Sequence, residues 1–149
     1  MKSCAFTGHR KFKEEELDIN KLDEAIYERI EKGERRFLCG MAYGFDLIAA
    51  ERVLEFKKSY KIELVACVPY AGQGSGLSFA ARNKYRSILD KSDEVLVLAN
   101  NYYDGCFLAR DKYMVENSDS LICFMRRKEG GTFYTYSYAE KLGKEIILI

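Results

Sequence analysis

The sequence lacks several features, and each absence excludes a class of protein. No window approaches the roughly 18 uncharged apolar residues of a membrane span, and the N-terminus has the pattern of a strand rather than a signal peptide. Positive charge is not in excess, because 24 lysines and arginines are matched by 23 acidic residues, which argues against broad binding to a phosphate backbone. We therefore expect a soluble, cytoplasmic protein with no membrane partner and no general affinity for nucleic acid.

The cysteines also lack a pattern. The five residues Cys4, Cys39, Cys67, Cys106 and Cys123 are odd in number and show no CxxC spacing, and four of them lie inside apolar runs. We expect buried free thiols in a reducing compartment, without a disulfide framework or a metal site.

Apolar runs and helical patterns alternate along the chain. A length of 149 residues with 48% hydrophobic content suits one sizeable core and is too short for two ordinary domains. The pattern predicts strands at 3–6, 36–39, 61–68, 94–98, 121–125 and 145–149, and helices at 14–32, 46–58, 79–90, 104–117 and 131–142. Because the strand runs are apolar without alternation, both sheet faces should be covered. Residues 1–149 are therefore expected to form one three-layer α/β/α Rossmann-like domain with a mostly parallel sheet of about six strands.

Unusual residues gather where the predicted strands end. Ligands of open parallel sheets bind outside the carboxyl ends of the strands, where helix N-termini converge. The candidate ligand-binding residues at this edge are Thr7, Gly8, His9, Arg10, Gly40, Met41, Ala42, Gly44, Asp46, Gln73, Gly130, Gly131 and Thr132. We expect the loops that carry Gly8, Gly44 and Gly131 to converge on one crevice.

The residue types indicate separate roles. Gly130-Gly131-Thr132 precedes the last helix, and with Arg126 and Arg127 nearby it is the best phosphate cradle of the sequence. Arg10 suits an anion, since guanidinium geometry matches phosphate oxygens. Asp46 stands at a helix start, as a cap or as an acceptor for a ribose or base group. The lone His9 is either structural or a ligand contact.

Several runs resemble the YpsA-type branch of the SLOG superfamily over nearly the whole chain and in the right order. They are Thr7–Arg10, Gly40–Leu47 with Ala49–Glu51, Pro69 with Gln73, Arg82 with Tyr85–Leu89, Arg110–Val115 with Ser118-Asp119, and Gly130–Thr132 leading to Tyr138-Ala139. The resemblance implies a Rossmann-like fold and a ligand related to nucleotides, nucleotide sugars, ADP-ribose or a cyclic nucleotide signal. It adds Arg110 to the candidate ligand-binding residues.

The sequence departs from that family pattern in three places. Leu77 or Phe79 stands where a tryptophan is expected, and Asp111 where an asparagine is expected. The superfamily's phosphoribohydrolases carry a catalytic glutamate after a PGGxGT motif, whereas Phe133–Tyr136 follow Thr132 here. The resemblance therefore carries no catalytic residue onto this chain.

The leading interpretation is a sensor, carrier or sequestering module for a nucleotide-derived small molecule, with no cofactor assigned. One alternative is an N-glycosidic-bond hydrolase or transferase that uses Asp46 or Glu51 beside His9, and Asp104 is a further acidic residue placed near the crevice. Because Asp46 stands at a helix N-terminus, we expect the helix dipole to favour its ionised form. The second alternative is single-stranded DNA binding, by analogy with the fold of DprA. The sequence leaves a homo-oligomer open.

Overall fold

The computed structural model describes residues 1–149, and its centre is a sheet of six parallel strands in the order β4-β3-β2-β1-β5-β6. The strands are β1 (Lys2–Gly8), β2 (Glu34–Cys39), β3 (Glu63–Val68), β4 (Glu94–Val97), β5 (Ser120–Phe124) and β6 (Glu145–Leu148). The helices are α1 (Ile19–Glu31), α2 (Phe45–Lys57), α3 (Phe79–Lys91), α4 (Cys106–Glu116) and α5 (Gly130–Lys141), with 3-10 turns η1 (Glu14–Glu16) and η2 (Gln73–Gly76). None of the helices has the length and apolar character to cross a bilayer.

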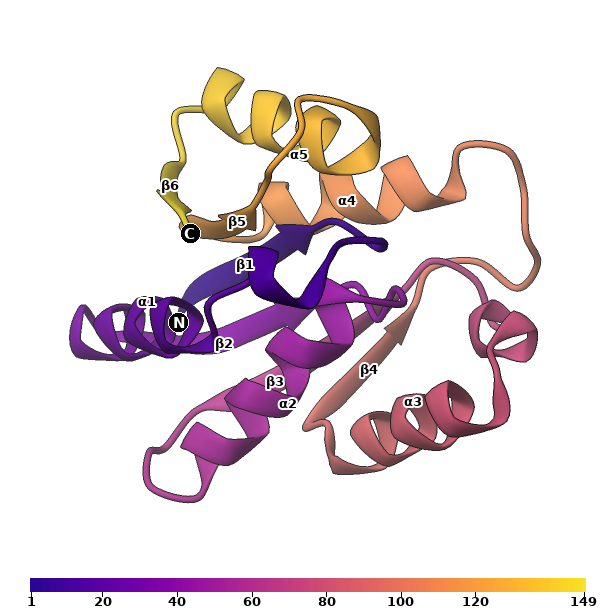
Figure 1. Cartoon of the computed structure of the whole chain (residues 1–149), viewed down its shortest axis with the longest axis horizontal. Helices are drawn as coiled ribbons and strands as arrows, with labels where there is room; N and C mark the ends of the chain where they lie inside the picture. Colours follow the sequence, from indigo (N-terminus) through magenta and orange to yellow (C-terminus); the bar gives the residue numbers. More distant parts are fainter.

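Helices cover both faces of the sheet, which confirms the predicted three layers (Figure 1). A cluster of 23 buried residues, with Ile26 of α1, Val53 of α2 and Ile88 of α3, fills the space on one face. A smaller cluster of nine, with Met114 of α4 and Ala139 of α5, fills the other. Apolar burial on both faces explains why the strand sequences do not alternate.

The helix predicted from residue 14 starts later than expected. Glu14–Glu16 form the turn η1, and α1 begins at Ile19. The Asp18 carboxylate accepts a hydrogen bond from the Asn20 amide at 2.9 Å and caps the helix there. The acidic residues that suggested a first helical turn therefore precede the helix.

The cysteines lie where the apolar runs placed them. Cys4, Cys39, Cys67 and Cys123 are buried on β1, β2, β3 and β5 as free thiols, and Cys106 is buried at the start of α4. Burial raises the pKa of Cys4, Cys67 and Cys123 to about 12, so these thiols are unreactive near neutral pH.

The strand order reverses direction between β1 and β5. From β1 the chain moves outward through β2 and β3 to β4, and α4 then returns it across the sheet to β5 and β6. The loops after β1 and β5 therefore diverge at the carboxyl edge, because their helices pack on opposite faces. Such a switch point is where open α/β sheets leave a crevice.

Candidate functional site

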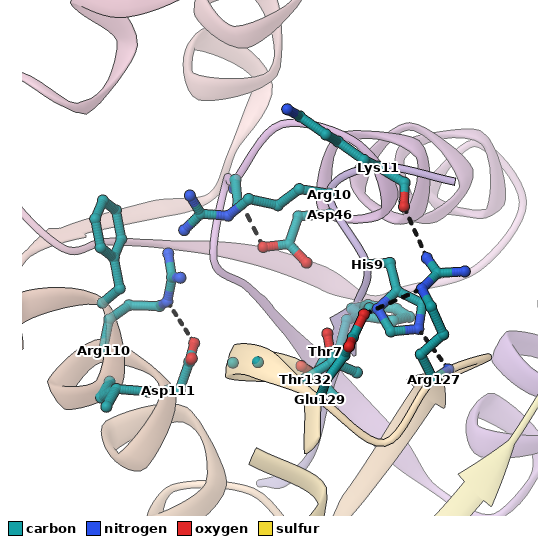
Figure 2. Close-up of a pocket in the computed structure, with 17 residues that line it drawn as sticks. Thr7, His9, Arg10, Lys11, Asp46, Arg110, Asp111, Arg127, Glu129 and Thr132 are labelled. Carbon is teal, nitrogen blue, oxygen red and sulfur yellow. Dashed lines mark hydrogen bonds and ion pairs between the residues drawn. The ribbon is translucent and has the colours of Figure 1, made fainter. Parts of the chain in front are cut away.

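A crevice of about 780 Å³ opens at this switch point, within the size range of small-molecule sites. It lies over the end of β1, the first turns of α2 and α5, and one face of α4. In Figure 2 the Arg110–Asp111 pair marks one end, His9 and Arg127 the other, and Thr7 and Thr132 lie between them. We call this cavity the switch-point crevice.

The N-terminus of α5 supplies hydrogen-bond donors to the crevice. Glu129 is its N-cap and makes no side-chain capping bond, and Gly130, Gly131 and Thr132 form the first turn, whose amides have no helical acceptor. Thr132 and Thr7 of β1 are each 7% exposed, and neither hydroxyl has a hydrogen-bond partner within the protein. The hydroxyls of two largely buried threonines are thus left to a ligand or solvent in the crevice.

His9 holds the turn before α5. Its Nε2 accepts hydrogen bonds from the backbone amides of Arg126 at 2.8 Å and Arg127 at 3.2 Å, which requires the neutral ring with its proton on Nδ1. Burial, with the charge of Arg127, lowers the pKa of His9 and favours that form. The histidine lines the crevice and also orients the loop that carries the glycines.

The two arginines of this turn have different surroundings. The guanidinium of Arg126 donates to the carbonyl oxygens of Glu16 and Ile149, so it does not line the crevice. Arg127 lines it, although its guanidinium also contacts the carboxylates of Glu16 at 3.3 Å and Glu129 at 3.5 Å. Of the two arginines expected beside the phosphate cradle, only Arg127 is in place.

A buried charge cluster forms the opposite end. Arg110, 3% exposed, donates to Asp111 at 2.7 Å and to the Gly40 carbonyl oxygen. Asp46, 7% exposed, accepts from the Ala42 amide at 3.1 Å. Burial raises the pKa of Asp46 to about 6 against the opposing charge of Arg110.

The structure contradicts one of the two interpretations of Asp46, that it caps α2. The N-cap of α2 is Gly44, and Asp46 lies in the first turn with its carboxylate bonded to Ala42 instead of capping. We expected the helix dipole to favour the ionised form; burial instead raises the pKa to about 6, although the carboxylate remains the major form at pH 7.

Arg10 and Phe107 form the mouth of the crevice. The Arg10 guanidinium carbon lies 4.6 Å from the centre of the Phe107 ring, which also packs against Tyr70 and Tyr102. Neither Arg10 nor its neighbour Lys11 pairs with a carboxylate, and both side chains are exposed. The mouth therefore presents the Arg10 guanidinium stacked on the Phe107 ring, with the Lys11 cation nearby.

The structure gathers most of the candidates. Ten of them line the switch-point crevice, namely Thr7, Gly8, His9, Arg10, Ala42, Asp46, Arg110, Gly130, Gly131 and Thr132. The other four, Gly40, Met41, Gly44 and Gln73, do not. Gln73 donates to the Gly40 carbonyl oxygen at 3.3 Å and accepts from the Tyr85 hydroxyl at 3.1 Å, and Met41 is buried with a φ of 62°.

The glycines after β2 have packing roles. Gly44 has a φ of +90°, and a Cβ there would lie 2.3 Å from the carbonyl oxygen of Arg10. A Cβ on Gly40 would lie 2.9 Å from the guanidinium of Arg110 and from the Asp46 carboxylate. Only glycine permits these approaches, which bring the β1, β2 and α4 segments together. The loops of Gly8 and Gly131 meet as expected, whereas Gly44 lines a neighbouring groove.

Seven further residues line the crevice that the sequence did not mark as ligand-binding. They are Phe6, Lys11, Phe107, Leu108, Asp111, Arg127 and Glu129. Three come from α4, whose positions 107, 108, 110 and 111 share one helical face. Glu129 directly precedes Gly130, whereas the catalytic glutamate of the phosphoribohydrolase motif would follow Thr132. Glu51 and Asp104 lie outside the crevice, bonded to Lys84 at 3.4 Å and to the Tyr102 hydroxyl at 3.2 Å.

Comparison with known protein families shows to which family the chain belongs. The sequence model described as the YspA SLOG family, YpsA, matches residues 4–146. The chain belongs to the YpsA family. Among similar proteins, the UPF0398 protein of Listeria welshimeri is 32% identical, with 97% of this chain and 86% of that one aligned. The UPF0398 protein of Halalkalibacterium halodurans is also 32% identical, over 80% of this chain and 65% of that one.

Solved structures of similar fold are those of DNA processing protein A. The Helicobacter pylori protein, described by its single-stranded DNA binding mode, has a TM-score of 0.71 at 19% identity, over 99% of this chain and 64% of that one. The Streptococcus pneumoniae protein has a TM-score of 0.69 at 16% identity, over 99% and 50%. At these identities the likeness concerns the fold, so this YpsA-family chain corresponds to a part of those longer proteins.

Proposed function

We propose that the switch-point crevice binds a phosphorylated, nucleotide-derived small molecule, and that the protein acts as its sensor or carrier. The observation that carries this proposal is that Thr7 and Thr132, both largely buried, line the crevice with unpartnered hydroxyls beside the free first-turn amides of α5. Amides at a helix N-terminus and hydroxyl donors suit phosphate oxygens. Arg127 and Arg10 supply positive charge at the same cavity.

The buried carboxyl group of Asp46 indicates which way round the ligand binds in the crevice. Asp46 lines the crevice next to Arg110 and Gly40, and a carboxylate there disfavours a phosphate. The Asp111 carboxylate, which Arg110 pairs, lies closer to Gly131 of α5. Carboxylates suit ribose hydroxyls or a base amino group, which donate hydrogen bonds. The phosphate is therefore assigned to the α5 end, the sugar to the Asp46 end, and the base to the mouth, where it can stack on the Arg10 guanidinium that covers Phe107.

The test is calorimetry with AMP and ADP on Thr132→Val and Thr7→Val, which remove a hydroxyl at nearly constant volume. Each lost hydrogen bond to phosphate should lower affinity by about tenfold. Thr135→Val is the matched control, because Thr135 lies on the same helix but donates to the Gly131 carbonyl oxygen and does not line the crevice. Equal affinities for all variants, or no binding by the parent protein, would refute the assignment.

The raised pKa of Asp46 favours a second candidate, cleavage of an N-glycosidic bond. A carboxyl with a pKa of about 6 can donate or accept a proton near neutrality. Incubation with nucleoside monophosphates and ADP-ribose, followed by chromatography, separates the two functions. Free base released by the parent protein and absent with Asp46→Asn would establish the enzyme, whereas the binding proposal expects intact ligand.

Single-stranded DNA binding is the third function to separate, because the Helicobacter pylori neighbour is described by that property. The crevice here carries Asp46, Asp111 and Glu129 among its lining residues, and the chain has a net charge of +1. Both features disfavour a polyanion. We expect a decathymidine strand to bind more weakly than ADP in the same buffer.

A further inference from the structure

A second cavity adjoins the switch-point crevice. This groove of about 520 Å³ lies between the first half of α2 and the first turns of α3. Arg10 and Lys11 line both cavities, so the two are joined at the loop after β1. We call it the α2–α3 groove.

The charges of the groove have one sign. Arg10, Lys11 and Lys84 line it and no acidic residue does, in contrast to the crevice with its three carboxyl groups. Arg10 and Lys11 have no ion-pair partner. Lys84 contacts Glu51 at 3.4 Å, but both side chains are nearly half exposed, and such a pair contributes little. The groove is therefore complementary to an anionic group placed at Arg10 and Lys11.

Between these cations the wall is apolar. Leu47 and Ile48 of α2 face Ala80 of α3 across the groove, and the Tyr43 ring, 54% exposed, stands beside it. A flat, uncharged ring system attached to a phosphate fits this combination of apolar walls and basic edges. A monophosphate held in the crevice alone leaves the groove unused.

We propose that the ligand has two nucleoside parts joined by phosphate, with one nucleoside in the crevice, the bridging phosphates between the first turn of α5 and the Arg10-Lys11 loop, and the second nucleoside in the α2–α3 groove. This inference rests on the proposed function and adds its ligand class, a free dinucleotide. Lys84 then lies at the far end, where it contacts the second nucleoside or its phosphate.

The experiment is calorimetry with AMP and diadenosine diphosphate on the parent protein and three variants. Lys84→Ala removes the distal cation, and Ala80→Tyr fills the groove at an exposed helical position. Lys91→Ala, on the same helix but outside the groove, is the control. We expect the dinucleotide to bind about tenfold more tightly than AMP, and both groove variants to remove most of that advantage while AMP affinity stays unchanged.

The outcomes separate this inference from the proposed function. AMP and dinucleotide binding with equal affinity, or a dinucleotide affinity unaffected by Lys84→Ala and Ala80→Tyr, overturns the two-part ligand and leaves the crevice assignment standing. Absence of binding by either nucleotide overturns both. An octathymidine strand is the last arm: if it binds and depends on Lys84 while the dinucleotide does not bind, the free dinucleotide is overturned in favour of a nucleic-acid strand.

Discussion

Replacing Asp46 by asparagine should stabilise the protein at neutral pH. The carboxyl group is 7% exposed, and its pKa of about 6 lies above the ordinary value of 3.8 because burial penalises the charge. A raised folded-state pKa means that the contribution of this group to stability is full below pH 4 and is lost as the pH rises through 6. The displacement corresponds to about 3 kcal/mol above pH 7 as an upper bound. Asparagine keeps an oxygen that can accept from the Ala42 amide.

Urea unfolding at pH 4 and at pH 7.5 provides the assay. We expect Asp46→Asn to match the parent protein at the lower pH and to exceed its unfolding free energy by about 1–3 kcal/mol at the higher one. Asp90→Asn, at an exposed position on α3, is the control and should stay within about 0.5 kcal/mol at both. A variant less stable than the parent at pH 7.5 would show that Arg110 compensates the Asp46 charge in full, and would refute the reasoning.

Two further substitutions test how the site is built, both by denaturant unfolding. Gly44→Ala should cost at least about 2 kcal/mol, because φ is +90° and the new Cβ would meet the Arg10 carbonyl oxygen, whereas Gly105→Ala, with a φ of +93° but open space around it, should cost about 1 kcal/mol. Equal costs would mean that the loops after β1 and β2 are not in close contact. Arg29→Ala should cost about 3–5 kcal/mol, because it removes a buried guanidinium that contacts Glu145 at 2.8 Å and buried Glu34 at 3.6 Å. Glu145→Ala, at a half-exposed partner, should cost less than about 1 kcal/mol, and a loss as large as that of Arg29→Ala would contradict this account.

The sheet could be predicted because its evidence is local. Each strand is an apolar run bounded by polar residues, and each following helix repeats apolar positions at helical spacing. The glycine loop before Asp46 marked a tight turn with a positive φ, which the structure has at Gly44. The start of α1 was misplaced because three consecutive glutamates resemble a first helical turn, although Asp18 supplies the cap.

The α4 side of the crevice could not be predicted from local patterns. Phe107 and Asp111 reach the switch point only because the crossover from β4 to β5 lays α4 over the end of β1. The position of α4 over β1 cannot be predicted from local sequence patterns, because the loop between β4 and α4 has no helix or strand that would indicate where the crossover leads. Likewise, adjacent Arg126 and Arg127 are alike in sequence, and only the fold directs one towards Ile149 and the other into the crevice.

The choice between a binder and an enzyme depends on the buried carboxyl group of Asp46. The Asp46 carboxyl is buried next to Arg110, which already pairs with Asp111, and burial raises the pKa of Asp46. A buried carboxyl with a shifted pKa in a crevice is typical of a group that contacts a ligand or takes part in a reaction. If Asp46 receives a ribose or base donor, bound ligand should lower its pKa, and AMP should bind more tightly as the pH rises from 5 to 7. If Asp46 instead donates a proton during cleavage, turnover should fall over the same interval. Binding and turnover thus respond with opposite sign to the titration of Asp46. Because the AMP phosphate itself has a second pKa of about 6, the pH series is run in parallel on Asp46→Asn, and only the difference between the two proteins is assigned to Asp46.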